Sequence, residues 1–351
     1  MNTRKIKKAI KRIKKLPRNK YLFFYLKNKI VHFALKITKS TKVAYPSTVM
    51  LELTNRCNLS CSTCAREYDY GKQMDLGSMD EQMAKKIIDQ IWCYLDSIGL
   101  TGMGETFLYP NIKNIVDYIK SKNEGIIISV STNAMTQHFI EQVSPLVGLV
   151  DTIQVSIDGL GEVYESIRKK ANFAGLQSNL EALVAMCNNT QTAVMLNMVV
   201  TKENHHQMAD LVQFARKTGI KYMDFTMFNL AAVTQIDKSY YDFYQSADFL
   251  TALQGLKETQ KQVKEVVVSY HSFDTNHRFR ACPFPWSHFY ICWDGYLTPC
   301  CAKPFPKELH FGNVFNKRVI EVLNNEQFRT WRHAWFENQT PAFCDKCHFT
   351  V

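Results

Sequence analysis

The first 45 residues contain no aspartate or glutamate, although they hold fifteen of the 43 lysines and arginines of this 351-residue chain. The rest of the chain contains 28 basic and 32 acidic residues, so the net positive charge comes from the N-terminal segment. Long apolar runs are also absent. The apolar stretch 21–37 is interrupted by Lys27, Lys29 and Lys36 and falls short of the roughly 20 apolar residues of a membrane span.

No small-residue cleavage site follows that stretch, which argues against a secretory signal peptide. Without a secretory signal, the eleven cysteines indicate a reducing compartment and metal ligation rather than a disulfide framework. Apolar residues make up 46% of the chain, which is ample for a core, and the length suits one large domain and a smaller one. Composition therefore predicts a cytoplasmic, globular, metal-binding protein.

The segment 1–45 reads as a basic amphipathic arm. One helical face would carry the apolar side chains of Ile6, Ile10, Ile13 and Leu16, and Pro17 should end that helix. A basic amphipathic helix followed by an aromatic-rich run is typical of a peripheral element on an anionic membrane surface. A helical cap packed on the main domain is the alternative. Nucleic acid, bound through its phosphates, is the least favoured partner.

Three cysteines stand close together directly after an apolar, strand-like stretch at 49–53. Cys57, Cys61 and Cys64 have the spacing C-x3-C-x2-C. A structural zinc site uses four protein ligands, usually in two short pairs. Three thiolates instead leave one iron of a 4Fe-4S cube without a protein ligand, and that iron can bind a small molecule. A zinc knuckle is the alternative interpretation.

From 45 to about 228 the chain alternates strand-like and helix-like stretches. Apolar strands are expected at 48–53, 97–101, 126–131, 150–156, 193–200 and 221–227. Amphipathic helices are expected between them at 79–95, 111–122, 176–188 and 204–218. Repeated βα units predict an α/β fold with a parallel sheet and helices outside it. If the sheet curls into a barrel, the chemistry should gather where strands end.

The cysteine spacing and its place after a strand resemble the radical S-adenosylmethionine (radical SAM) superfamily. The resemblance implies a partial (β/α)6 barrel, and a 4Fe-4S cluster whose open iron chelates S-adenosylmethionine and cleaves it to a 5′-deoxyadenosyl radical. It also implies a reducing electron donor such as flavodoxin or ferredoxin. The residue before the third cysteine, often aromatic in the family, is Thr63 here, so adenine packing must come from elsewhere.

Further stretches resemble the family's cofactor-binding motifs. Residues 102–105, Gly-Met-Gly-Glu, resemble the GGE motif, and 131–134 look like the STNG turn with Ala134 in place of glycine. Residues 156–159, Ser-Ile-Asp-Gly, resemble the SxDG signature, and an arginine common after it could clamp the methionine carboxylate. Ordinary turns and surface acids are the alternative reading. The implied cofactor-binding residues are Gly102, Gly104, Glu105, Asn133, Ser156, Asp158, Arg168 and Asn197.

A second group of cysteines lies near the C-terminus, after a helical stretch that is rich in lysine and glutamine. Residues 291–296 predict a hairpin with an Asp-Gly turn. The whole region resembles the SPASM/twitch extension of radical SAM enzymes, in its shortened form with one auxiliary cluster. The resemblance implies a domain order of 1–45 for the basic arm, 46–235 for the radical SAM core, 236–275 for a helical linker and 276–351 for the auxiliary cluster domain.

On that resemblance, a second 4Fe-4S cluster is ligated by Cys282, Cys300, Cys344 and Cys347. Cys301 competes with Cys300 for its position, and a zinc ribbon is the structural alternative for the same thiolates. The remaining cysteines, Cys93, Cys187 and Cys292, are expected to be buried, inert thiols.

The resemblance covers residues 47–351 and implies a radical SAM oxidoreductase, most simply one that oxidises or epimerises an alcohol, a sugar or a lipid-linked glycan. One alternative is a maturase of ribosomally made peptides, although 1–45 does not read as a leader-binding module. The other is an iron-sulfur electron-transfer protein that never cleaves S-adenosylmethionine, against which the motifs at 102–105 and 156–159 argue. The sequence identifies no catalytic acid or base.

Overall fold

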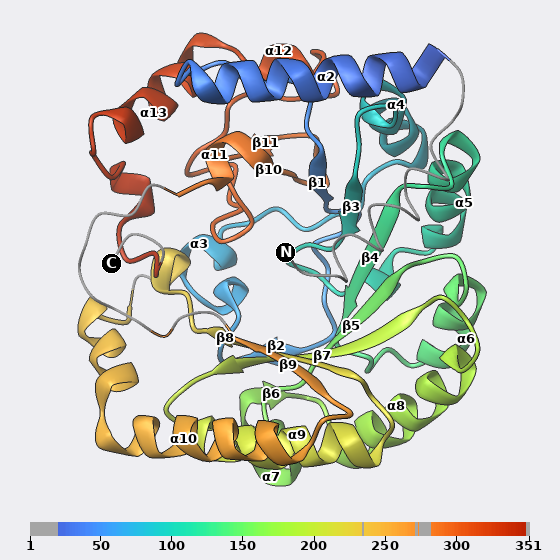
Figure 1. Ribbon diagram of the computed structural model, residues 1–351, viewed down its shortest axis with the longest axis vertical. Coiled ribbons are helices and arrows are strands. Elements are labelled where there is room, and N and C mark those ends of the chain that lie inside the picture. Colours follow the sequence, from blue (N-terminus) through green and yellow to red (C-terminus); the bar gives the residue numbers. More distant parts are fainter. Residues whose placement is uncertain (1–19, 234, 271–272, 274–281, 349–351) are drawn as a thin grey trace.

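The computed structural model describes residues 20–233, 235–270, 273 and 282–348 (Figure 1). The isoleucine stripe expected within 6–16 lies outside the described residues. Across the described ranges, no helix is both long and apolar enough to cross a membrane.

A nine-stranded sheet forms the centre of the molecule, in the order β11-β10-β1-β3-β4-β5-β7-β8-β9. Neighbouring strands run parallel except for β10 and β11. The six strands expected from the sequence are β1 (Thr48–Leu51), β3 (Ser97–Leu100), β4 (Ile127–Thr132), β5 (Thr152–Ser156), β7 (Ala193–Val200) and β8 (Tyr222–Met227). They follow one another in chain order along an arc (Figure 1), which is the predicted partial (β/α)6 arrangement.

The two faces of the sheet differ in burial because side chains alternate along a strand. On β7, Val194, Leu196, Met198 and Val200 belong to the buried core, whereas the residues between them are half-buried. β4, β5 and β8 show the same alternation. The buried set packs beneath the helices, so the half-buried set faces the inside of the arc.

Helices cover the outer face of this arc (Figure 1). They are α4 (Glu81–Ile91), α5 (Ile112–Lys122), α6 (Phe139–Val143), α8 (Phe173–Cys187) and α9 (Met208–Lys217). Two begin at side-chain caps. The Asp80 carboxylate accepts hydrogen bonds from two backbone N–H groups of α4, and Asn172 accepts one from Gly175 of α8 at 2.7 Å. All four helices predicted between the strands are therefore present.

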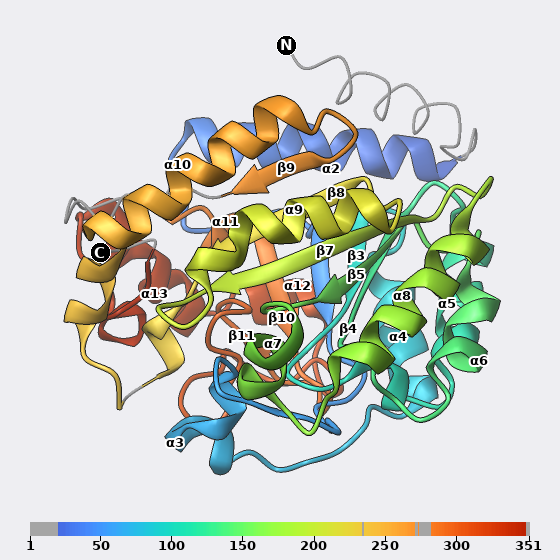
Figure 2. The ribbon, with the colours of Figure 1, turned by 90° about the horizontal axis from the view of Figure 1, so that it is seen from below.

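The stretch expected to be a helical linker also contains a strand. A 3-10 helix, Lys238–Gln245, leads into α10 (Ala247–Gln262), and β9 (Val267–Tyr270) then pairs with β8. Helices α9 and α10 pack side by side on the outside of this end of the sheet (Figure 2). The four-residue β9 was not predicted, because so short a run shows its strand character only when a sheet edge is available.

The C-terminal region continues the main sheet beyond β1. β10 (His288–Ile291) lies parallel to β1, and β11 (Leu297–Thr298) returns antiparallel to it. The predicted hairpin is confirmed: Gly295 in its turn has φ +85°, a left-handed conformation that favours glycine. Three helices complete this region, α11 (Phe284–Ser287), α12 (Val319–Leu323) and α13 (Glu326–Phe336).

Helix α2 (Lys20–Ile37) lies across the outside of the molecule (Figure 1). Its inner side packs Tyr21 on Trp92, with ring centroids 4.4 Å apart. Asp96 accepts hydrogen bonds from the Tyr25 hydroxyl at 2.9 Å and from Lys29 Nζ at 2.8 Å. The aromatic run thus forms one continuous helix that is fixed to the main domain.

Candidate active site and cluster ligands

The cysteine loop leaves the carboxyl end of β1, the third strand in the order of the nine-stranded sheet. Its short strand β2 (Ser60–Cys61) pairs antiparallel with β6 (Arg168–Lys169), so that Cys61 lies opposite Arg168. The Ser62 N–H also donates to the carbonyl oxygen of Ile167 at 2.9 Å. These bonds join the three cysteines to the helix α7 (Gly161–Ile167), which follows the Ser-Ile-Asp-Gly stretch. Two motifs about 100 residues apart in sequence thereby become neighbours.

The three thiols lie half-buried in one electrostatic neighbourhood. Burial raises the pKa of Cys61 to about 12, Arg168 opposes this rise, and the other two thiols add to it. Burial also raises the pKa of Cys64. Buried thiolates this close together need a cation to neutralise them, and iron ions supply that charge.

Two nitrogens stand beside these sulfur atoms. Asn133 Nδ2 lies 3.9 Å from Cys57 Sγ, and Arg168 Nη1 lies 3.9 Å from Cys61 Sγ. In the described part of the chain, no three His, Cys, Asp or Glu side chains already stand in metal-binding geometry. The fit to a cluster therefore rests on the thiolate donor set, the shared loop and these neighbouring donors.

Glu105 joins two of the predicted motifs. Its side chain is 2% exposed and accepts hydrogen bonds from Thr132 Oγ1 at 2.7 Å, the Asn133 N–H at 2.6 Å and the Phe107 N–H at 3.1 Å. Burial raises the pKa of Glu105, and these hydrogen bonds oppose that rise. This carboxylate thus holds the 102–105 loop against the 131–134 turn.

Backbone packing explains the small residues of these motifs. A Cβ at Gly104 would stand 2.4 Å from the carbonyl oxygen of Arg56, and one at Gly102 would stand 2.4 Å from Glu52 Cγ. Only glycine lets this loop lie so close to the cysteine loop. Ala134, which replaces the family's usual glycine, has φ +56°, so the turn keeps its left-handed conformation despite the methyl group.

Asp158 and Arg168 form a buried ion pair beside Cys61. Arg168 Nη2 lies 2.8 Å from Asp158 Oδ2, with the two side chains 10% and 0% exposed. The other Asp158 oxygen accepts the Val199 N–H at 2.9 Å. Burial lowers the pKa of Arg168, but Asp158 and the Cys61 thiol outweigh burial and hold that pKa above its ordinary value. The pair fixes a permanent cation next to the cysteine loop.

Ser156 and Asn197 are register partners on the inner face of the sheet. Ser156 lies opposite Asn197, and Asn197 lies opposite Asp224 on β8. Asn197 Nδ2 is 3.5 Å from Asp224 Oδ2, and the Ser269 hydroxyl donates to Asp224 Oδ1 at 2.6 Å. The structure thus brings all the predicted cofactor residues to one edge and inner face of the sheet. It adds Asp224, which sequence reasoning missed.

Glu52 is a second residue that sequence reasoning missed. It directly follows β1 and is 2% exposed. It accepts hydrogen bonds from the Met103 N–H at 2.7 Å, the Tyr290 hydroxyl at 2.5 Å and the Trp293 N–H at 3.3 Å. Burial raises the pKa of Glu52. An acidic residue inside the apolar run Val-Met-Leu-Glu-Leu was the available signal for it.

The four cysteines expected to hold the auxiliary cluster form a second group of thiols. Burial raises the pKa of Cys344, and Cys300, Cys347 and Cys282 raise it further. Cys301 in turn raises the pKa of Cys282, and Cys300 raises that of Cys301. The choice of Cys300 rather than Cys301 as the ligand stays a prediction. Of the cysteines expected to be inert, Cys187 and Cys292 are buried and Cys93 is half-buried.

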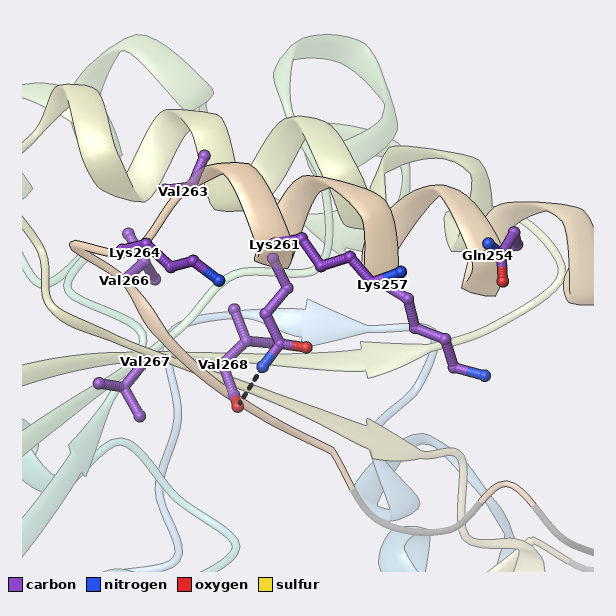
Figure 3. Close-up of a pocket in the computed structure, with 9 residues that line it drawn as sticks. Gln254, Lys257, Lys261, Val263, Lys264, Val266, Val267 and Val268 are labelled. Carbon is purple, nitrogen blue, oxygen red and sulfur yellow. Dashed lines mark hydrogen bonds between the residues drawn. The ribbon is translucent and has the colours of Figure 1, made fainter.

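A cavity of about 450 Å³ lies elsewhere, between α10 and β9 (Figure 3). It is lined by the valines of β9 and by lysines that include Lys257, Lys261 and Lys264. No cysteine or predicted cofactor residue lines it. It is therefore not the place where the cysteine loop would present a cofactor.

The profile of the radical SAM superfamily matches residues 51–215, and that of the iron-sulfur cluster-binding SPASM domain matches residues 282–348. The chain belongs to the radical SAM superfamily. Domains of these two kinds together bind S-adenosylmethionine and two 4Fe-4S clusters. Which residues ligate each cluster and contact the cofactor is our proposal from the geometry above.

Two curated proteins are similar over most of this radical SAM chain. A tungsten-containing aldehyde ferredoxin oxidoreductase cofactor-modifying protein of Pyrococcus furiosus is 25% identical over 85% of this chain and 86% of its own length. The antilisterial bacteriocin subtilosin biosynthesis protein AlbA of Bacillus subtilis is 24% identical over 92% of this chain and 68% of its own length.

Among solved structures, Streptococcus suis SuiB bound to its precursor peptide SuiA has a TM-score of 0.66 at 15% identity. The similarity covers 93% of this chain and 74% of SuiB, and it shows that the two folds agree. SuiB has also been solved with S-adenosylmethionine bound.

Replacing Cys57, Cys61 and Cys64 with alanine should abolish 5′-deoxyadenosine formation, because it removes every protein ligand of the cofactor-binding cluster. Iron in the anaerobically reconstituted protein should fall from about eight to about four atoms per chain. The matched control, Cys93→Ala with Cys187→Ala, should keep both iron and activity. Cleavage of S-adenosylmethionine by the triple variant under dithionite would contradict the assignment.

Cys300→Ala should remove the auxiliary cluster, whereas Cys301→Ala should leave the iron content near that of the wild type, about eight atoms per chain. The two substitutions change neighbouring thiols of similar burial, so each serves as the control for the other. Iron and zinc analysis of both variants measures the difference. About four irons with one zinc in the wild type would favour a zinc ribbon instead.

Asp158→Asn should weaken S-adenosylmethionine binding about tenfold or more, because it leaves the buried Arg168 without its counter-charge. Equilibrium dialysis of the reconstituted protein measures the affinity. Asp151→Asn, at the opposite end of β5, is the control, since Asp151 also accepts a buried backbone hydrogen bond, from the Ile128 N–H at 3.0 Å. Equal losses of affinity in both variants would show a general effect on folding and not a role for the ion pair.

Proposed function

We propose that this radical SAM enzyme is a maturase that abstracts a hydrogen atom from a residue of a peptide substrate. The observation that carries this proposal is the similarity to AlbA, which spans 92% of the chain and so includes the cysteine loop. The fold of a protein solved with its precursor peptide is consistent with it. The names of these relatives give no support to the alcohol, sugar or lipid-linked glycan expected from the sequence.

The inner wall of the sheet also suits a peptide. The half-buried positions of β4, β5, β7 and β8 carry several hydroxyl and amide groups, among them Ser129, Ser131, Gln154, Ser156 and Asn197, and a single carboxylate, Asp224. They carry no lysine, arginine or histidine. A nucleotide sugar or a lipid diphosphate would need cations here, whereas amide and hydroxyl groups can hydrogen-bond a peptide backbone.

When bound, the cluster and S-adenosylmethionine supply the radical chemistry. The chain's own residues orient the reactants. Glu105 fixes the loops around the cofactor, Asp158 holds Arg168 beside the cysteine loop, and Asp224 offers a hydrogen-bond acceptor on the substrate side of the sheet. We assign Asp224 the role of orienting the substrate.

The reaction also needs a low-potential electron source. We propose a small reducing protein of the flavodoxin or ferredoxin kind as this partner, and the cytoplasm as the compartment, because the many free thiols require a reducing environment. A pure electron-transfer role is disfavoured, because the motifs at 102–105 and 156–159, which resemble those that bind the cofactor, lie beside the cysteine loop.

The proposal is tested with peptides encoded beside this gene. The reduced, reconstituted enzyme should release 5′-deoxyadenosine faster when its peptide is present, and mass spectrometry should show loss of hydrogen from that peptide. Asp224→Asn should lower peptide modification about tenfold or more while leaving release without peptide unchanged. Asp210→Asn, on the exposed side of α9, is the matched control. Stimulation by sugars and by none of these peptides would overturn the proposal.

A further inference from the structure

Helix α2 exposes an unusual amount of apolar surface. Twelve large apolar side chains are exposed in the described residues, and seven of them belong to this one helix. Five form a stripe that we call the outer face of α2. They are Phe23, Leu26, Ile30, Phe33 and Ile37, with exposed fractions of 64%, 50%, 68%, 64% and 65%. Their spacing of three and four residues places them along one side of the helix.

This stripe cannot turn toward the protein, because the opposite side of α2 is fixed by polar contacts. Asn28 is 7% exposed, and its side chain both donates to the Tyr45 carbonyl oxygen and accepts the Tyr45 N–H, each at 3.0 Å. Asp96 holds Tyr25 and Lys29, as described above. The usual polarity of a surface helix is thus reversed, with polar anchors inside and apolar side chains in solvent.

Cations surround the stripe. Lys27, Lys36, Lys39 and Lys42 are exposed on or just after the helix, and residues 1–45 contain no acidic side chain. A mostly apolar cavity of about 300 Å³ adjoins the C-terminal end of α2. Lys36, Lys39 and Lys42 line it together with Trp286, Trp335 and Phe336. Apolar and aromatic surface beside unpaired positive charge is the composition of a protein surface that binds anionic lipid.

We propose that the outer face of α2 docks on an anionic membrane surface, with the helix lying in the plane of the headgroups. The apolar stripe would enter the boundary between headgroups and acyl chains, and the lysines would meet lipid phosphates. This orientation would hold the enzyme peripherally, since no described helix can span the bilayer. The proposal does not depend on the identity of the substrate.

The lysines beside the stripe disfavour a second copy of the chain as the partner that covers the outer face of α2. The stripe has the repeat of a coiled-coil seam, and two such helices could pair. The flanking positions, however, carry Lys27 and Lys36 and no acid. In a dimer built on this face, lysines would oppose lysines, and like charges at such positions are destabilising. An anionic lipid surface can bury the apolar stripe and also pair its phosphates with the flanking lysines.

The test uses the reconstituted full-length enzyme and vesicles of phosphatidylcholine with or without phosphatidylglycerol. Wild type should sediment with the anionic vesicles and only weakly with the neutral ones. Ile30→Gln combined with Phe33→Gln should lower the partition coefficient by about a hundredfold, because each of the two buried apolar side chains contributes about a factor of ten. Lys27→Gln combined with Lys36→Gln should lower binding to anionic vesicles only.

Leu250→Gln is the matched control, since Leu250 is a 48% exposed leucine on α10, and it should bind like wild type. In 1 M salt, where the Debye length is roughly 3 Å, binding should fall steeply. Iron content and 5′-deoxyadenosine release without substrate should be unchanged in every variant, because no altered residue adjoins the cysteine loop.

Three results would overturn the proposal. If the Ile30 and Phe33 double variant sediments like wild type, α2 is not the docking surface. If the lipid-free wild type is a dimer and this variant is a monomer, the outer face of α2 binds a second copy of the chain. If the wild type does not bind anionic vesicles but binds RNA with a steep salt dependence, the positive charge of this segment binds nucleic acid.

Discussion

Three buried carboxylates, one at the end of β1 and two in the loops after β3 and β5, hold the candidate site together. Glu52, Glu105 and Asp158 are each nearly inaccessible to solvent, and each accepts hydrogen bonds from segments distant in sequence. A buried carboxylate is costly unless its oxygens are satisfied. The loops at this edge of the sheet therefore cannot separate without exposing an unsatisfied charge, and this constraint keeps the cysteine loop, the glycine motif and Arg168 in one place.

The same constraint couples the two groups of thiols. Glu52 accepts hydrogen bonds from Tyr290 and Trp293 of the C-terminal region as well as from Met103 of the glycine motif. β10 pairs with β1 through four residues, so the C-terminal region shares the sheet that carries the cysteine loop. The auxiliary cluster site is thus built onto the radical SAM core. A change in one part would reach the other through Glu52 and the β1–β10 pairing.

The two sides of helix α2 differ in how they are stabilised. Its inner side contributes aromatic packing and hydrogen bonds to Asp96 and Tyr45, whereas its outer face leaves five large apolar side chains in solvent. Because apolar exposure on this scale is unfavourable in water, the outer face is most simply explained by a surface that covers it in use. The C-terminal end of this helix, at the cavity with Trp286 and Trp335, also lies next to Cys282.

The sequence by itself determined the strands, the helices between them, and the thiols of both groups. Alternating apolar residues and fixed cysteine spacings are local signals, so the cysteine loop and six strands, β1, β3, β4, β5, β7 and β8, could be predicted without a structure. The two-residue strands β2 and β6 could not, because they exist only as a pairing between distant segments. The Asp-Gly hairpin was equally local, since its turn needs only a residue that accepts positive φ. The resemblance of the short motifs then indicated which strand ends should carry the cofactor.

Only the tertiary structure decided the rest, because it depends on contacts between distant segments. Glu52 and Asp224 look ordinary in sequence and gain their roles from Tyr290, Asn197 and Ser269. β9 becomes a strand because β8 offers it an edge. The outer face of α2 became visible only once the polar contacts of Asn28 and Lys29 had fixed which side of the helix meets the protein.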